Sequence, residues 1–98
     1  MQVGSIIVDR HSYGRGGADF YEITRETKCF YIVRQLNTIR VPTSPHRQTG
    51  YVIPGDTHVG ELRRCKKLKD YDFIRVSATP GAYASLYNSE RRYDFYND

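Results

Sequence analysis

The stretch ADFYEITRETKCFYIVRQL, residues 18–36, decides the fold because it holds two runs of strand-forming residues separated by one short polar segment. Side chains alternate along a strand, so Tyr21 and Ile23 share one face of the first run, opposite Phe20. The segment TRETK joins the two runs and predicts a tight hairpin. The second run is apolar on both faces from Phe30 to Val33, which indicates a central strand of the sheet.

Working outward, short runs of strand formers bounded by Gly, Pro, Asn and Asp recur along the chain, whereas helical periodicity is hard to find. The predicted strands are residues 2–9, 18–26, 28–36, 50–55, 59–65 and 71–77. Residues 82–88 form either a last strand or a single helical turn. These five to six short antiparallel strands predict one all-β domain over residues 1–98, a small SH3-like or OB-like barrel whose closure removes exposed strand edges.

Two segments rich in turn formers separate the later strands. The segment PTSPHRQTG at 42–50 has two prolines and no apolar residue, and we expect a mobile loop there. The segment IPGD at 53–56 predicts a type II turn, because Pro presets the first central residue and Gly permits positive φ at the second.

The charge of the chain is mildly basic. Fifteen Lys and Arg against eleven Asp and Glu leave a formal charge of +4 and a pI near 9.2. This excess favours anionic partners but is equally compatible with an ordinary solvated surface. No apolar stretch is long enough for a membrane span and no signal peptide opens the chain, so we expect a cytosolic protein with reduced thiols and no membrane partner.

Residues for metal binding or catalysis are sparse. Cys29 and Cys65 lie 36 positions apart without a CxxC motif, so neither a zinc site nor a disulfide framework is indicated, and Cys29 is expected to be a small core residue. The histidines His11, His46 and His58 are scattered, and no Ser or Cys lies in an activating motif. Asp9, Glu22 and Glu61 could meet on adjacent strands, but their spacing does not demand it. We therefore expect no enzyme activity, no metal and no cofactor.

Two segments could contact phosphate. SYGRGG at 12–17 places Arg15 among glycines whose backbone N–H groups could cradle an anion, although a plain flexible loop is the interpretation that we favour. RRCKKLK at 63–69 holds five positive charges in seven residues and could bind backbone phosphates, or could be a loop kept soluble by its charge.

The C-terminal segment YNSERRYDFYND at 87–98 mixes aromatic, basic and acidic residues. Aromatic and basic side chains could clamp single-stranded bases, but the acids would repel phosphates. We favour a segment that folds back and covers the core with Tyr93, Phe95 and Tyr96.

The chain resembles a loosely defined group of small proteins from bacteriophages, plasmids and integrated elements, which carry Trp-Gly-Tyr, then Thr-Asn, then Asp-Phe-Tyr and a β-run. Matching positions are Tyr13, Asp19, Phe20, Tyr21 and Ile23, and the Tyr-rich end near 87–96 is a second similarity. The chain departs from the pattern where His11 replaces the Trp, Ser12 the Gly, and Gly16-Gly17 the Thr-Asn. The resemblance implies a mobile-element accessory protein of a bacterial cytoplasm and brings no catalytic residues.

Two hypotheses of function follow. In the first, the protein binds nucleic acid without catalysis, and the contact residues are Tyr13, Arg15, Arg63, Arg64, Lys66 and Lys67. In the alternative, it is a phage-encoded inhibitor of host defence, for example anti-CRISPR-like, that binds a host protein through tyrosines and arginines. Both hypotheses explain the abundance of Tyr and Arg.

Overall fold

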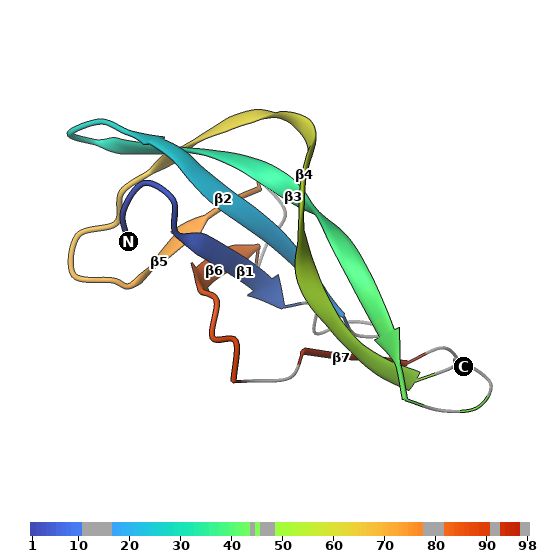
Figure 1. Cartoon of the computed structure of the whole chain (residues 1–98). Helices are drawn as coiled ribbons and strands as arrows, with labels where there is room; N and C mark the ends of the chain where they lie inside the picture. The colour runs from blue at the N-terminus through green and yellow to red at the C-terminus, as the bar shows by residue number, and fades with distance from the viewer. Residues whose placement is uncertain (11–16, 44, 46–48, 78–81, 91–92, 97–98) are drawn as a thin grey trace.

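The computed structural model describes residues 1–10, 17–43, 45, 49–77, 82–90 and 93–96. Seven strands are present in this part of the chain: β1 (Ile6–Arg10), β2 (Ala18–Glu26), β3 (Phe30–Pro42), β4 (Thr49–Lys66), β5 (Phe73–Arg75), β6 (Tyr83–Leu86) and β7 (Tyr93–Tyr96). They form one antiparallel sheet in the order β5-β6-β1-β2-β3-β4-β7 (Figure 1). The prediction of an all-β fold is confirmed.

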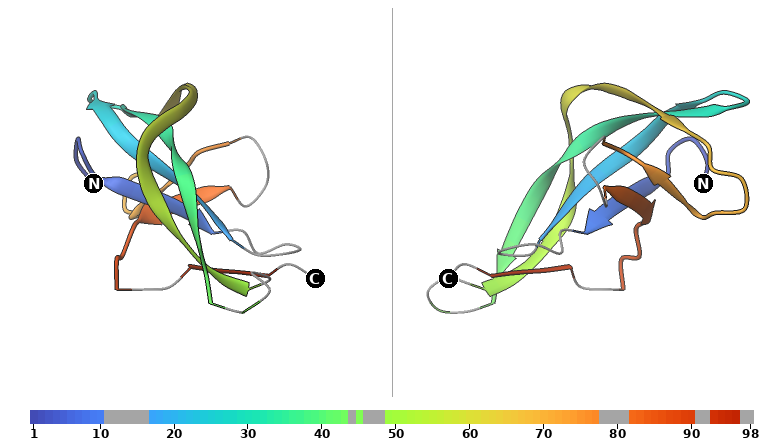
Figure 2. Two further views of the ribbon diagram at one scale, coloured as in Figure 1. Left: turned by 45° about the vertical axis from the view of Figure 1, so that its right-hand side comes forward. Right: turned by 180° about the vertical axis from the view of Figure 1, so that it is seen from behind.

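The sheet is open in the described part of the chain. Its order begins with β5 and ends with β7, and these two strands do not pair with each other. The predicted closed barrel of five to six short strands is therefore not what the described strands form. The reason is strand length: β3 has 13 residues and β4 has 18, and together with β2 they make a long twisted ribbon (Figure 2). The molecule measures 48 × 26 × 25 Å as a result.

The predicted hairpin between β2 and β3 is present, although β3 spans Phe30–Pro42 instead of the predicted 28–36. β2 has the predicted bounds, and Thr27 closes the turn: its backbone N–H donates to the carbonyl of Phe30 at 2.8 Å, and its Oγ1 accepts the N–H of Phe30 at 3.0 Å. β3 lies between β2 and β4, as expected for a central strand. The prediction for Cys29 was wrong, because it lies in this turn and is exposed, while Cys65 is buried.

The predicted strands at 50–55 and 59–65 are two halves of β4, so the prediction of a type II turn at 53–56 was wrong. Leu36 pairs with His58 and Thr38 with Pro54, which leaves three residues of β4 opposite Asn37. Because of this β-bulge, Pro54 and Gly55 lie within the strand and do not form a turn. The side chain of Asn37 fills the bulge, and its Oδ1 accepts the N–H of Thr57 at 3.0 Å.

A second bulge lies at Gly60, whose φ of 75° is a conformation that glycine adopts without strain. Gln35 pairs with Val59 and Arg34 with Leu62, so two residues of β4 have no partner across the ladder. The Nε of Arg34 donates to the Gly60 carbonyl at 3.1 Å. With two bulges, β4 arches over the rest of the sheet (Figure 1).

The remaining strands differ from the predictions mainly in their bounds. The predicted strand at 2–9 begins only at Ile6, because Gly4 has a φ of 91° and the N–H of Ser5 donates back to the Gln2 carbonyl. Residues 82–88 contain strand β6 rather than a helical turn. The predicted loop 42–50 connects β3 to β4, and its residues 44 and 46–48 lie outside the described part.

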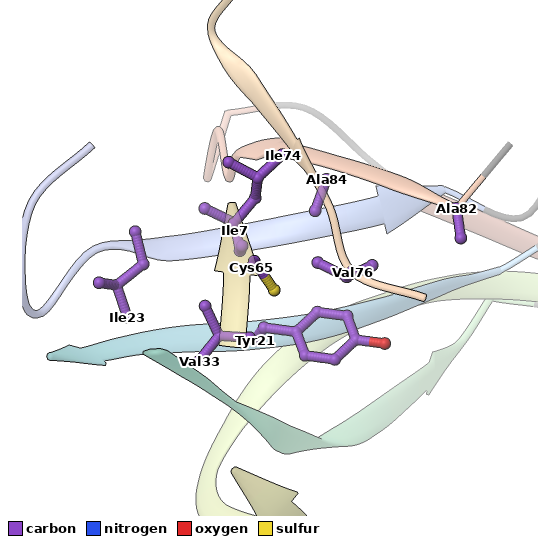
Figure 3. Packing of buried hydrophobic residues seen from close by; sticks show 9 residues of the cluster. All are labelled: Ile7, Tyr21, Ile23, Val33, Cys65, Ile74, Val76, Ala82 and Ala84. Atoms are coloured by element: carbon purple, nitrogen blue, oxygen red, sulfur yellow. The ribbon is translucent and has the colours of Figure 1, made fainter. Parts of the chain in front are cut away.

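Two hydrophobic clusters cover opposite faces of the sheet, because neighbours along a strand point to opposite sides. The first core, shown in Figure 3, contains Ile7, Tyr21, Ile23, Val33, Cys65, Ile74, Val76, Ala82 and Ala84. The second core contains Val8, Ala18, Phe20, Leu36, Val52 and Tyr93. β1 and β2 are consequently buried on both faces.

Tyr93 of β7 is the residue that closes the second core. It is 3% exposed, and its ring lies 6.0 Å from that of Phe20 and 5.6 Å from that of Tyr87, centroid to centroid. The prediction that the C-terminal segment folds back over the core is confirmed for Tyr93. The structure describes the backbone of Phe95 and Tyr96 in β7 but not their side chains.

Candidate nucleic-acid interface

The basic segment RRCKKLK lies at the end of β4, and strand geometry divides its side chains between two faces. Cys65 lies in the first core and Arg63 contacts Tyr21 and Val76 of that core, so Arg64 starts from the opposite face. The linear density of charge is therefore not one patch on the folded surface. Tyr13 and Arg15, the other two predicted contact residues, lie outside the described residues.

Arg63 is a structural residue in this arrangement. Its Nη1 donates to the backbone carbonyl of Val76 at 2.9 Å, and its guanidinium carbon lies 5.5 Å from the ring centroid of Tyr21. Burial raises the pKa of the Tyr21 hydroxyl, and the charge of Arg63 partly opposes that rise. One of the five N–H donors of Arg63 is thus used within its own chain, although the residue is exposed.

Arg64 faces a shallow arginine groove of about 630 Å³ on the other side of β4. Its guanidinium carbon lies 4.5 Å from the ring centroid of Phe30. The groove is also lined by Thr24, Arg25, Ile32, Arg34, His58, Leu62 and Arg63, and Leu62 is 62% exposed. The groove therefore combines positive charge with accessible apolar surface.

Lys66 and Lys67 lie at a second concavity, of about 470 Å³, between the end of β4 and the hairpin turn of β2 and β3. The two segments meet because the N–H of Lys67 donates to the carbonyl of Cys29 at 2.8 Å. Lys28 from the turn and Lys69 from the segment after β4 therefore line the same cavity. We call this concavity the lysine cavity: four lysines line it with one carboxylate, that of Asp72.

The four lysines of the cavity are not equivalent. The Nζ of Lys67 lies 2.5 Å from Oε2 of Glu26 and 4.8 Å from the ring centroid of Tyr31, so its charge is held by an ion pair and a cation–π contact. The residues Lys28, Lys66 and Lys69 are exposed. These three are the better placed to meet a phosphate.

Three aromatic residues lie beside the cavity and form an aromatic trio: Tyr71, Phe73 and Tyr83. The ring centroid of Phe73 lies 5.0 Å from that of Tyr71 and 5.2 Å from that of Tyr83. Tyr71 and Phe73 line the cavity itself. Tyr71 is 64% exposed and Tyr83 46%, so large parts of both rings meet solvent.

Of the predicted residues, the structure thus brings Lys66 and Lys67 together at the lysine cavity, and Arg63 and Arg64 together at the arginine groove. Sequence reasoning missed Lys28, Lys69 and the aromatic trio. A signal was present for part of the set, because KKLKDYDF at 66–73 places three lysines directly before two aromatic residues within eight positions. No local pattern linked Lys28 to this segment, since that proximity depends on the pairing of β3 with β4.

Other reactive groups do not assemble into a second centre in the described residues. No group of three His, Cys, Asp or Glu side chains there could hold a metal ion. Glu22, one of the three acids considered as ligands, instead lies 2.6 Å from Nε2 of His58. Burial raises the pKa of the Cys65 thiol, which keeps it protonated and poorly nucleophilic at neutral pH. His11 and His46 lie outside the described residues.

The described part of the chain holds no helix that could cross a membrane. Comparisons with protein-family models, with curated proteins and with solved structures found no match to this chain. The resemblance to proteins of mobile elements therefore stays a prediction from the sequence.

Proposed function

We propose that this protein binds nucleic acid without catalysing a reaction, and that the lysine cavity is its contact surface. The observation that carries the proposal is that Lys28, Lys66 and Lys69 line one cavity together with the exposed ring of Tyr71 and the half-buried ring of Phe73. Lysine ammonium groups neutralise backbone phosphates and release counterions, while aromatic rings offer contact area to bases. A mobile-element accessory role in a bacterial cytoplasm, and an SH3-like or OB-like arrangement of the strands, remain part of the same proposal.

The test compares two matched double variants by fluorescence anisotropy with labelled oligonucleotides at several salt concentrations. Lys66→Gln with Lys69→Gln removes two charges from the lysine cavity, and Arg25→Gln with Arg64→Gln removes two from the arginine groove. If the cavity holds two phosphates, the lysine variant flattens the slope of log K against log salt by about 1.8 for duplex DNA or about 1.4 for a single strand. The arginine variant should leave the slope close to that of the parent.

Two results would contradict the proposal. Equal loss in the two double variants would mean that diffuse charge, not the cavity, attracts the nucleic acid. Absence of any anisotropy change with the parent protein at low salt would remove the proposal altogether, because electrostatic binding is tightest there. Circular dichroism of each variant verifies that the sheet is retained.

A second candidate function, a phage-encoded inhibitor that binds a host defence protein, is favoured by the arginine groove. Arginine and exposed apolar side chains together are typical of the centre of a protein interface, and Leu62 and Arg64 supply both. A pull-down from bacterial lysate with and without nuclease separates the two functions. A stoichiometric protein that survives nuclease and is lost with Leu62→Asp would support the inhibitor, whereas material lost on nuclease treatment would support nucleic-acid binding.

A further inference from the structure

We infer that the nucleic acid bound at the lysine cavity is single-stranded, and that Tyr71 stacks on one of its unpaired bases. This inference rests on the proposed function and adds to it the class of ligand and the residue that selects it. It depends on the position of the aromatic trio relative to the lysines and on the high solvent exposure of Tyr71.

The backbone holds Tyr71 and Lys69 on the same rim of the cavity. Between them Asp70 has a φ of 70°, and the N–H of Tyr71 donates to the carbonyl of Leu68 at 3.4 Å. This tight turn places a lysine ammonium and an aromatic ring two positions apart in the chain, both lining the cavity. A phosphate and the base of the same strand can therefore be contacted together.

Phe73 supports the Tyr71 ring from behind. The two rings are tilted by 43° with centroids 5.0 Å apart, and Phe73 in turn meets Tyr83 edge to face at 74°. Strands β5 and β6 fix these positions, since Arg75 pairs with Tyr83 and Phe73 with Ser85. With 64% of Tyr71 exposed, the supported ring keeps surface available for a ligand.

The accessible partner for such a ring is an unpaired base. In a duplex the flat faces of each base are covered by the neighbouring base pairs, so a side chain on the outside reaches only base edges, sugars and phosphates. The cavity, about 470 Å³, lies within the ~300–1,000 Å³ of sites that enclose small ligands. It can enclose part of a flexible strand, whereas a duplex can only lie across its mouth.

The test uses three labelled probes of about 12 nucleotides, within the range of known single-strand site sizes. They are an oligo-dT strand, a duplex of equal length, and an abasic strand that keeps the phosphates but lacks bases. The duplex carries more phosphates, so charge alone would favour it. We expect the parent protein to bind oligo-dT more tightly than the duplex, and the abasic strand about fivefold or more weakly than oligo-dT.

Two variants of Tyr71 locate the stacking. Tyr71→Leu removes the ring but keeps an apolar side chain, and should weaken oligo-dT binding about fivefold or more while leaving abasic binding unchanged. Tyr71→Phe keeps the ring and should stay within about twofold of the parent, because only the hydroxyl is lost. Because Tyr71 is exposed, both variants should retain the parent's unfolding transition in urea.

The outcomes separate the two proposals. Duplex binding as tight as oligo-dT binding, equal binding of the abasic strand, or an unaltered Tyr71→Leu variant would overturn the stacking inference while nucleic-acid binding stands. The aromatic trio would then be only a cover for the edge of the sheet. No binding of any probe at low salt would overturn the proposed function and this inference with it.

Discussion

Arg63 of β4 is hydrogen-bonded to Val76, the residue that follows β5, although β4 and β5 are not neighbours in the strand order. Its Nη1 donates to the Val76 carbonyl at 2.9 Å, so β4 is tied to the segment that leaves β5. The backbone ladder never connects β4 with β5 in the described residues, and this side-chain contact bridges them across the first core. A residue predicted to meet a ligand thus helps to hold the curl of the sheet.

The first prediction concerns this contact. Arg63→Gln should lower the free energy of unfolding by about 1–2 kcal/mol, because a charge-assisted hydrogen bond and a cation–π contact are both lost. Arg64→Gln is the matched control: it loses only the contact with Phe30 and should change stability by less than about 1 kcal/mol. Urea unfolding of the two variants measures the difference, and equal values would show that the bond to Val76 adds nothing.

The second prediction compares two isoleucines on neighbouring strands. Ile23 is fully buried in the first core, whereas Ile32 is half-buried at the arginine groove. Ile23→Ala should cost about 2–5 kcal/mol, and Ile32→Ala about 1–2 kcal/mol because less area is removed from the protein interior. A reversed order in urea unfolding would contradict the assignment of the two faces.

The third prediction concerns the bulge in β4. A Cβ at Gly55 would lie 2.0 Å from Oδ1 of Asn37, so Gly55→Ala must displace the side chain that accepts the Thr57 N–H. We expect a loss of about 1–2 kcal/mol. In an Asn37→Ala background the space is free, and the added methyl should cost at least about 0.5 kcal/mol less. Strict additivity of the two changes would exclude this packing.

The fourth prediction concerns alkaline pH. Burial raises the pKa of Cys65 above the ordinary 9.0, so above pH 9 the unfolded thiol loses its proton while the folded one keeps it. The folded state then binds more protons, and stability falls as pH rises from the unfolded towards the folded pKa. Well below pH 9 this thiol is protonated in both states and contributes no pH dependence. Cys65→Ala should be less stable at pH 7 but should lose less stability between pH 8 and pH 10, measured by urea unfolding with reductant present.

The fold could be predicted where the local preferences of the residues agree with the strand pairing of the sheet. Residues 18–26 alternate cleanly and end at a polar turn, and β2 has these bounds. Pro54 and Gly55 are the opposite case, because their local preference for a turn is overruled by twelve residue pairings between β3 and β4. Cys29 was assigned to the core from its apolar neighbours, although the turn at Thr27 leaves it outside.

The candidate site could be predicted only in part, since charge density along a sequence ignores the alternation of a strand. Arg63 and Arg64 are neighbours in the chain, yet one donates to Val76 and the other lies over Phe30. Lys28 reaches the lysine cavity because the N–H of Lys67 binds the Cys29 carbonyl, a contact between residues far apart in sequence. Contacts between residues so far apart in the chain cannot be recognised from the local sequence pattern.

Strand β4 contributes Val52 to one core and Cys65 to the other, and this sharing has a thermal consequence. If either core melted, β4 would lose packing contacts on that side, and the other core, which also depends on β4, would be destabilised. The two cores should therefore melt together, in a single calorimetric peak whose van't Hoff enthalpy equals the calorimetric enthalpy. Neither half of the sheet would then persist as a partly melted intermediate on heating.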